Sequence, residues 1–184
     1  MKIETLKTTI CGAVCFLPKP HCDTRGSLTE IFRTDWLGSS AMNLQQANLS
    51  ISKKGVLRGL HYHLQQTDCW FCVRGSVRVM LVDLRQDSPT WRESYTTELF
   101  EEDPRLLVIP PGVAHGYYAL SNMALIYFVD ALYDGTDEQG VLWCDKDLSL
   151  PWNIDDSPIV SERDRKNPEF CRLFEKKSFP KYKK

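Results

Sequence analysis

Short runs of apolar and β-branched residues alternate with turn residues along most of this chain. Clusters such as Lys53-Lys54-Gly55, Asp87-Ser88-Pro89 and Pro110-Pro111-Gly112 return at a spacing of about 8 to 12 residues, which is typical of antiparallel sandwiches and barrels. Along residues 77–83 the apolar positions are half alternating and half continuous, as expected of a strand that lines a filled barrel. The fold class is therefore predicted to be all-β. The predicted strands are residues 27–33, 44–52, 56–63, 69–73, 76–84, 95–100, 106–109 and 124–131.

A length of 184 residues suits one domain with a sizeable core. The sequence shows no internal repeat and no low-complexity tract. Turn and charged residues dominate from Leu148 onward. We therefore expect a single domain over residues 1–184, with its core at about 25–145 and a short helical or irregular appendage at about 146–184.

Composition excludes several classes of protein. Hydrophobic residues make up 42% of the chain and the net charge is -1, so neither a disordered chain nor a nucleic-acid-binding surface is indicated. No apolar run reaches the roughly 20 residues that cross a bilayer. The charged residues Lys2, Glu4 and Lys7 lie where a signal peptide would have its apolar core. Seven scattered cysteines argue for reduced thiols. We expect a cytoplasmic protein with no membrane and no nucleic-acid partner.

Three of the four histidines lie in two short segments. His61 and His63 share the first segment with Asp68, and His115 ends the run Pro110-Pro111-Gly112-Val113-Ala114-His115. Alternate side chains of an extended strand share a face, so His61 and His63 are expected to point the same way. The spacing is that of the two halves of an active site in a small barrel.

Several ordered blocks make this pattern more specific. They are Asp23-Thr24-Arg25-Gly26, Val56-Leu57-Arg58-Gly59-Leu60-His61-Tyr62, Ile109-Pro110-Pro111-Gly112-Val113-Ala114-His115-Gly116-Tyr117, the segment from Tyr127 to Tyr133, Gly140-Val141-Leu142-Trp143 and Ser161-Glu162-Arg163-Asp164. In this order the blocks resemble the dTDP-4-dehydrorhamnose 3,5-epimerase family of cupins, and the likeness covers most of the chain. The resemblance implies a cupin fold, a double-stranded β-helix or jelly roll.

The resemblance also implies an isomerase that inverts C3, C5 or both carbons beside the C4 ketone of a nucleotide-linked 4-keto-6-deoxy sugar. A base removes the proton α to the ketone, an electrophile stabilises the enolate, and an acid returns a proton on the opposite face. No redox cofactor is required. By the resemblance, His61 is the base, Asp164 orients it, and Tyr133 is the acid. A tyrosine phenol fits that role because it is protonated at neutral pH and can still donate.

A nucleotide-diphosphate sugar is the implied ligand. Arginine suits a diphosphate because its planar fork donates to two oxygens and keeps its charge when desolvated. Arg58 is three residues from His61, so a regular strand would turn it away, but Gly59 permits a bulge that restores it. The family normally dimerises, so a homodimer is expected. The substrate-binding positions that the resemblance implies are Arg25, Glu30, Gln46, Asn48, Arg58 and His115.

At Asp68 the chain departs from the family pattern, which has a lysine there and usually a glutamine at the position of His63. Both changes restore ligand types of metal-binding cupins, so His61, His63, Asp68 and His115 form a set suited to Fe, Mn, Ni or Zn. A divalent metal could replace the lysine as the electrophile. However, a metal-bound His61 could not also serve as the free base. The alternative is a hydrogen-bonded pair of His63 and Asp68 in a metal-free epimerase.

Two other classes of function stay open at this stage. One is a metal-dependent cupin enzyme, such as a dioxygenase or an isomerase of a small molecule. The other is a non-catalytic cupin that binds a sugar nucleotide. The absence of the family lysine also leaves open the nucleotide, the sugar and the number of centres inverted.

Overall fold

The computed structural model describes residues 3–40, 42–154, 157–176 and 179–182. Helices are few: the 3-10 helix η1 (Thr34–Ser40) and the α-helices α1 (Glu162–Arg165) and α2 (Phe170–Lys176). The predicted all-β class is confirmed. The strands are β1 (Glu4–Lys7), β2 (Val14–Leu17), β3 (His21–Asp23), β4 (Gly26–Leu28), β5 (Gln46–Ser52), β6 (Val56–His63), β7 (Asp68–Arg74), β8 (Ser76–Asp83), β9 (Ser94–Phe100), β10 (Leu106–Ile109), β11 (Val113–Ala119), β12 (Met123–Val129), β13 (Glu138–Gly140) and β14 (Ile159–Val160).

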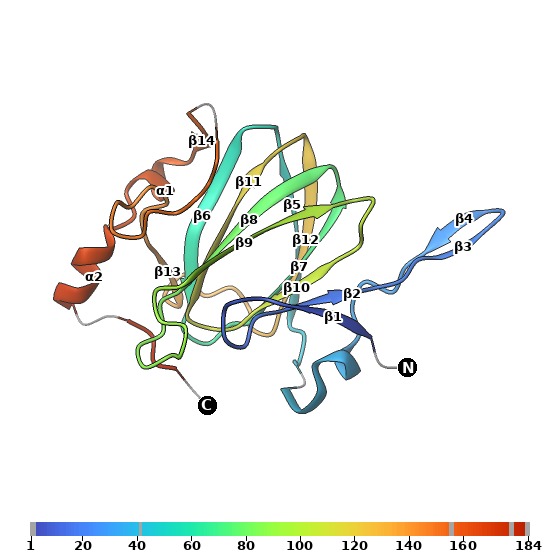
Figure 1. The fold of residues 1–184 in the computed structure, drawn as a ribbon, viewed down its shortest axis with the longest axis horizontal. Coiled ribbons are helices and arrows are strands. Elements are labelled where there is room, and N and C mark those ends of the chain that lie inside the picture. Colours follow the sequence, from blue (N-terminus) through green and yellow to red (C-terminus); the bar gives the residue numbers. More distant parts are fainter. Residues whose placement is uncertain (1–2, 41, 155–156, 177–178, 183–184) are drawn as a thin grey trace.

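Two six-stranded sheets form the body of the molecule (Figure 1). The first has the order β1-β2-β10-β7-β12-β5, and the second has the order β13-β6-β11-β8-β9 with β14 added beside β6. The β14 pairing is parallel, whereas the other pairings are antiparallel. Trp70, Leu107 and Leu125 from the first sheet meet Val79 and Leu81 from the second in one buried cluster. Apolar contact between the inner faces therefore holds the sandwich together.

Strand β8 is buried on both faces, which explains its half-continuous apolar pattern. Val79 and Leu81 point into the cluster between the sheets. Met80 and Val82 belong to a second cluster on the outer face, where they meet Phe170 and other residues of the C-terminal segment. The expected C-terminal appendage is therefore partly helical and covers the outside of the second sheet, beside β6 and β13 (Figure 1).

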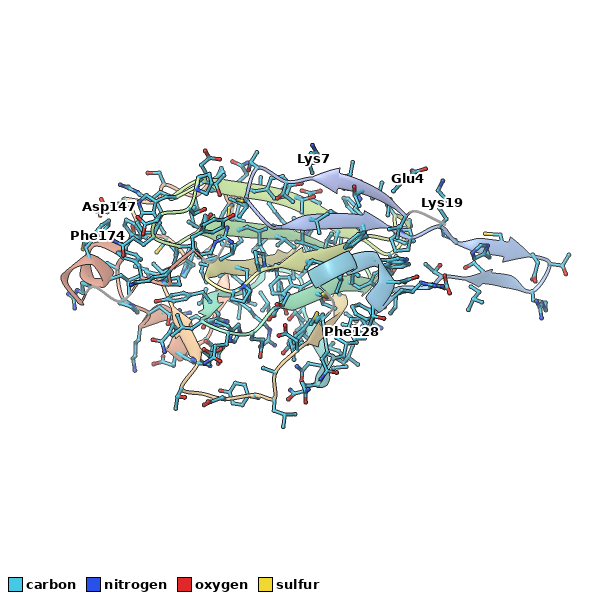
Figure 2. The ribbon with its side chains drawn as sticks, turned by 90° about the horizontal axis from the view of Figure 1, so that it is seen from below. Glu4, Lys7, Lys19, Phe128, Asp147 and Phe174 are labelled. Atoms are coloured by element: carbon cyan, nitrogen blue, oxygen red, sulfur yellow. The ribbon has the colours of Figure 1, made fainter. Side chains whose placement is uncertain are left out.

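The hairpin of β3 and β4, here called the arm, is a separate two-stranded sheet that projects from the body (Figures 1 and 2). Near its base in Figure 2, the amine of Lys19 lies 2.8 Å from a carboxylate oxygen of Glu4. The predicted strand 27–33 is wrong beyond Leu28. After the arm the chain turns irregularly toward η1, and Arg33 donates hydrogen bonds to Glu30 and Asp35.

The first sheet begins at Glu4, ahead of the start at about residue 25 that was expected for the core. The extent of the domain, 1–184, stays a prediction. Within the described ranges, the helices are too short and too polar to cross a lipid bilayer.

Candidate active site

A cavity of about 500 Å³ opens inside the barrel, with walls from both sheets. Strands β5, β7 and β12 contribute from the first sheet, and β6, β11 and β13 contribute from the second. Most of the predicted site residues lie in this wall. The lining residues are Gln46, Asn48, Ser50, Arg58, His61, His63, Gln66, Asp68, Trp70, His115, Tyr117, Leu125, Tyr127, Val129, Tyr133, Glu138 and Arg163.

His61 on β6 is hydrogen-bonded to Asp164 on α1, with 2.6 Å between Nε2 and Oδ1. The other oxygen of Asp164 accepts a hydrogen bond from the backbone N–H of Gly59, and Ser161 caps α1 by accepting from the N–H of Asp164. Burial alone would raise the pKa of Asp164, but the hydrogen bonds that it accepts, above all the one from His61, lower it. Because the ionised carboxylate must accept, Nε2 of His61 donates and Nδ1 is left to take up a proton.

Glu138 on β13 links His61 to Tyr133. Its Oε1 lies 3.5 Å from Nδ1 of His61, and its Oε2 accepts a hydrogen bond of 3.3 Å from the Tyr133 hydroxyl. The Arg163 guanidinium lies 2.8 Å from the same Oε2. Burial alone would raise the pKa of Glu138, but the hydrogen bond from Arg163 and the charge of that guanidinium lower it. The resting group is therefore a carboxylate.

Sequence reasoning missed Glu138 and Arg163. A signal for Arg163 was present, because it immediately precedes Asp164 in one of the blocks that carry the family resemblance. Glu138 lies on a strand of three residues, which is too short to show alternation.

His63, Asp68 and His115 form a second, buried group on the cavity wall. Each offers a donor atom, and these atoms lie within 4.8 Å of one another. His115 donates through Nδ1 to the carbonyl of Val113, and its Nε2 lies 3.7 Å from Asp68. Burial lowers the pKa of His115 to about 4, so the ring is neutral at neutral pH. Three of the four predicted metal ligands come together, whereas His61 lies outside this group and its Nε2 is bonded to Asp164.

Asp68, which stands where the resemblance implies a lysine, is satisfied by hydrogen bonds. One oxygen accepts from the side-chain amide of Gln66 at 2.8 Å, and the other accepts from the indole N–H of Trp70 at 3.0 Å. These partners are not His63, so the alternative of a hydrogen-bonded pair of His63 and Asp68 is not found among the described residues; Nδ1 of His63 lies 3.9 Å from Asp137. The wall therefore carries a carboxylate at the position where the resemblance implies a lysine.

Gly59 lets Arg58 and His61 share the cavity wall. The register of β6 against β11 shifts between these two residues, which confirms the predicted bulge. Gly59 has a φ of +120°, and a Cβ there would lie 2.7 Å from Cα of Gly116. Only glycine fits this close approach. Arg58 then donates a hydrogen bond of 3.2 Å to the Ser52 hydroxyl.

Gln46 and Asn48 are two residues apart on β5, and both face the cavity. The amide of Gln46 donates to the Asn48 side-chain oxygen at 2.8 Å and accepts from the backbone N–H of Tyr133 at 3.1 Å. Gln46 thereby ties the loop of Tyr133 to the cavity.

The structure does not bring Arg25 and Glu30 into the cavity of their own chain. Arg25 lies on the arm, its side chain is 88% exposed, and it is paired with Asp23. Glu30 follows the arm and is paired with Arg33 at 3.1 Å.

Comparison with known proteins gives a consistent result. The family model described as dTDP-4-dehydrorhamnose 3,5-epimerase matches residues 7–172. The dTDP-4-dehydrorhamnose 3,5-epimerase of Shigella flexneri is 35% identical over 175 residues, which covers 91% of this chain and 96% of that protein. The dTDP-4-dehydrorhamnose 3-epimerase of Streptomyces niveus is 34% identical over 155 residues, which covers 80% of this chain and 74% of that protein.

Comparison with solved structures supports the same family and the predicted fold. The crystal structure of dTDP-6-deoxy-D-glucose-3,5-epimerase from Legionella pneumophila, in complex with dTDP-4-keto-L-rhamnose, superimposes with a TM-score of 0.90 at 30% identity. The match covers 99% of this chain and 100% of that one, so the predicted cupin jelly roll is confirmed. Together with the match of the family model over most of the sequence, this shows that the chain belongs to the dTDP-4-dehydrorhamnose 3,5-epimerase family.

Proposed function

We propose that this protein epimerises a nucleotide-linked 4-keto-6-deoxy sugar at C3, C5 or both. The observation that carries the proposal is the hydrogen-bonded pair of His61 and Asp164, in which His61 lines the same cavity as Tyr133. His61 removes the proton α to the C4 ketone through Nδ1, while Asp164 holds the ring in the required tautomer. Tyr133 returns a proton on the opposite face. Proton removal and return balance without a redox cofactor.

The enolate and the diphosphate both need positive charge nearby. Among the described residues of the cavity wall, the arginines are Arg58 and Arg163. Arg163 is bonded to Glu138, so we assign Arg58 to the substrate. The neighbouring amides of Gln46 and Asn48 offer hydrogen bonds to the sugar or the base.

The direct test is incubation with dTDP-4-keto-6-deoxyglucose, followed by NMR assignment of the configuration at C3 and C5. We expect inverted product from the native protein and none from His61→Asn, which keeps the size of the side chain but cannot act as a base. Binding of dTDP without any conversion would contradict the proposal and support the non-catalytic sugar-nucleotide binder.

A divalent metal at His63, Asp68 and His115 is the second candidate, and it would favour a metal-dependent cupin enzyme. The three donors lie within 4.8 Å of one another, and Nδ1 of His115 is tied to a backbone carbonyl, as is usual for metal-bound histidines. Such a site could hold Fe, Mn, Ni or Zn. Elemental analysis decides between the two, because full activity in metal-free protein would eliminate a metal electrophile.

We also propose that the protein is a homodimer. The arm carries Arg25 away from the cavity of its own chain, and Leu28, the last residue of β4 at the base of the arm, is 71% exposed. In a dimer, the second copy would cover Leu28, and Arg25 would enter the cavity of that second copy. Mixing Arg25→Ala with His61→Ala protein tests this directly, because activity should return only in mixed dimers. The seven unpaired cysteines support a cytoplasmic location.

A further inference from the structure

Glu138 contacts both groups that the proposed reaction leaves in the wrong protonation state. We infer that Glu138 carries the proton from His61 back to Tyr133 between turnovers. The inference rests on the proposed function and adds a step that the epimerisation itself does not supply.

Inversion by two groups creates the need for this step. In one turnover His61 gains a proton from one face of the sugar, and Tyr133 loses its own proton to the other face. The enzyme is then left with an imidazolium and a phenolate. The next substrate of the same configuration requires a neutral imidazole and a phenol, so His61 must lose one proton and Tyr133 must regain one.

The geometry places one carboxylate between the two groups. Oε1 of Glu138 lies 3.5 Å from Nδ1 of His61, the nitrogen that holds the abstracted proton. Oε2 lies 3.3 Å from the Tyr133 hydroxyl. The Glu138 side chain is only 10% exposed, whereas Tyr133 is 64% exposed. The relay is therefore shielded along its middle but exchanges protons with solvent at Tyr133, so products formed in D2O still take up deuterium.

The transfer balances in two steps. First the N–H bond at Nδ1 of His61 breaks while an O–H bond forms at Oε1 of Glu138. A half-turn of the carboxyl group about its Cγ–Cδ bond then brings this proton to the phenolate. There the O–H bond of Tyr133 forms again, and Glu138 returns to its ionised state.

Arg163 completes the arrangement. It holds Oε2 at 2.8 Å and leaves Oε1 facing His61. The same ion pair favours the ionised carboxylate at rest, which is the form that can accept the proton. Glu138 is therefore a relay between two reacting groups and has no need to touch the sugar.

Rapid-mixing kinetics with Glu138→Gln test the relay. Glutamine has nearly the same shape but cannot carry the proton. With dTDP-4-keto-6-deoxyglucose we expect a first turnover close to the native rate, followed by a steady state slowed by about tenfold or more. Formate or imidazole added as a small proton carrier should restore the steady-state rate. Glu138→Asp, which retains a carboxylate, should lose less activity.

Asp137→Asn is the matched control. Asp137 precedes Glu138 in the sequence, but its carboxylate accepts hydrogen bonds from the backbone N–H groups of Leu64 and Gln65. We therefore expect no difference between the first turnover and the steady state in this variant. A native steady-state rate in folded Glu138→Gln would overturn the relay. A slow first turnover that small acids do not restore would also overturn it, because Glu138 would then only position its neighbours. Failure of the proposed function looks different, since the native protein itself would make no product.

Discussion

Asp164→Asn is the substitution that tests the catalytic pair most sharply. It keeps the size of the side chain and removes its charge. The backbone N–H of Gly59 donates to Oδ2, so the amide oxygen of the asparagine should stay at that position. Its NH2 group then faces Nε2 of His61, where the aspartate accepted a hydrogen bond of 2.6 Å.

The expected loss follows from two effects. A hydrogen bond to a charged group contributes about 1.5–3 kcal/mol. At about 1.4 kcal/mol per factor of ten, its loss in the transition state slows the reaction by roughly 10- to 150-fold. In addition, an amide N–H facing Nε2 forces the ring proton onto Nδ1, which removes the base. We therefore expect kcat to fall by about 100-fold or more, with the larger losses caused by the wrong tautomer.

The assay is the rate of deuterium uptake beside C4 in D2O, followed by NMR. The melting temperature of each variant is measured separately to show that the variant is folded. Asp145→Asn is the matched control, because Asp145 is also buried and accepts backbone hydrogen bonds, but it does not line the cavity. The control should keep the native rate per folded molecule. A folded Asp164→Asn protein with a rate within about threefold of native would refute the assignment of tautomer and base.

Three further predictions concern the acid, the bulge and the core. Tyr133→Phe should lower epimerised product by about 100-fold or more while deuterium exchange persists, and a native rate of product formation would remove Tyr133 as the acid. Gly59→Ala should lower the free energy of unfolding by about 2 kcal/mol or more in urea titration, because its Cβ would meet the backbone of Gly116, and unchanged stability would contradict this. Burial alone would raise the pKa of Asp83, but hydrogen bonds from Arg85, Ser88 and Thr90 lower it. The ionised Asp83 therefore stabilises the fold above about pH 4, and this stabilisation is lost as the pH falls further. Asp83→Asn should therefore cost about 3–5 kcal/mol at neutral pH and less in acid, and equal melting curves at neutral pH would refute the argument.

The pattern of apolar residues was enough to predict several strands that face the core, but not β2 or β11. The predicted strand 76–84 agrees with β8 to within a residue, because both of its faces pack against apolar clusters. Strand β1 was missed because it is an exposed edge strand whose four residues show no alternation. Strand β11 was missed because Val113 to Ala119 combines buried histidine, glycine and tyrosine, a mixture without a period of two.

Most of the site was predictable from the resemblance to a family and not from any periodicity. His61 and Asp164 were found in this way, although they are 103 positions apart. The link through Glu138 depends on how β13 pairs with β6, which brings Gly140 opposite His61, and no local pattern encodes that pairing. The local sequence around Arg25 likewise does not show whether this residue lines a cavity, because that depends on the direction in which the arm projects.

Proton exchange in D2O tests the central claim most directly. Native protein is incubated with dTDP-4-keto-6-deoxyglucose or its UDP analogue, and deuterium at C3 and C5 is followed by NMR beside His61→Ala. The account predicts deuterium at one or both carbons with the native protein and none with the variant. Folded native protein that leaves both sugars free of deuterium, or a His61→Ala variant that exchanges at the native rate, would contradict it.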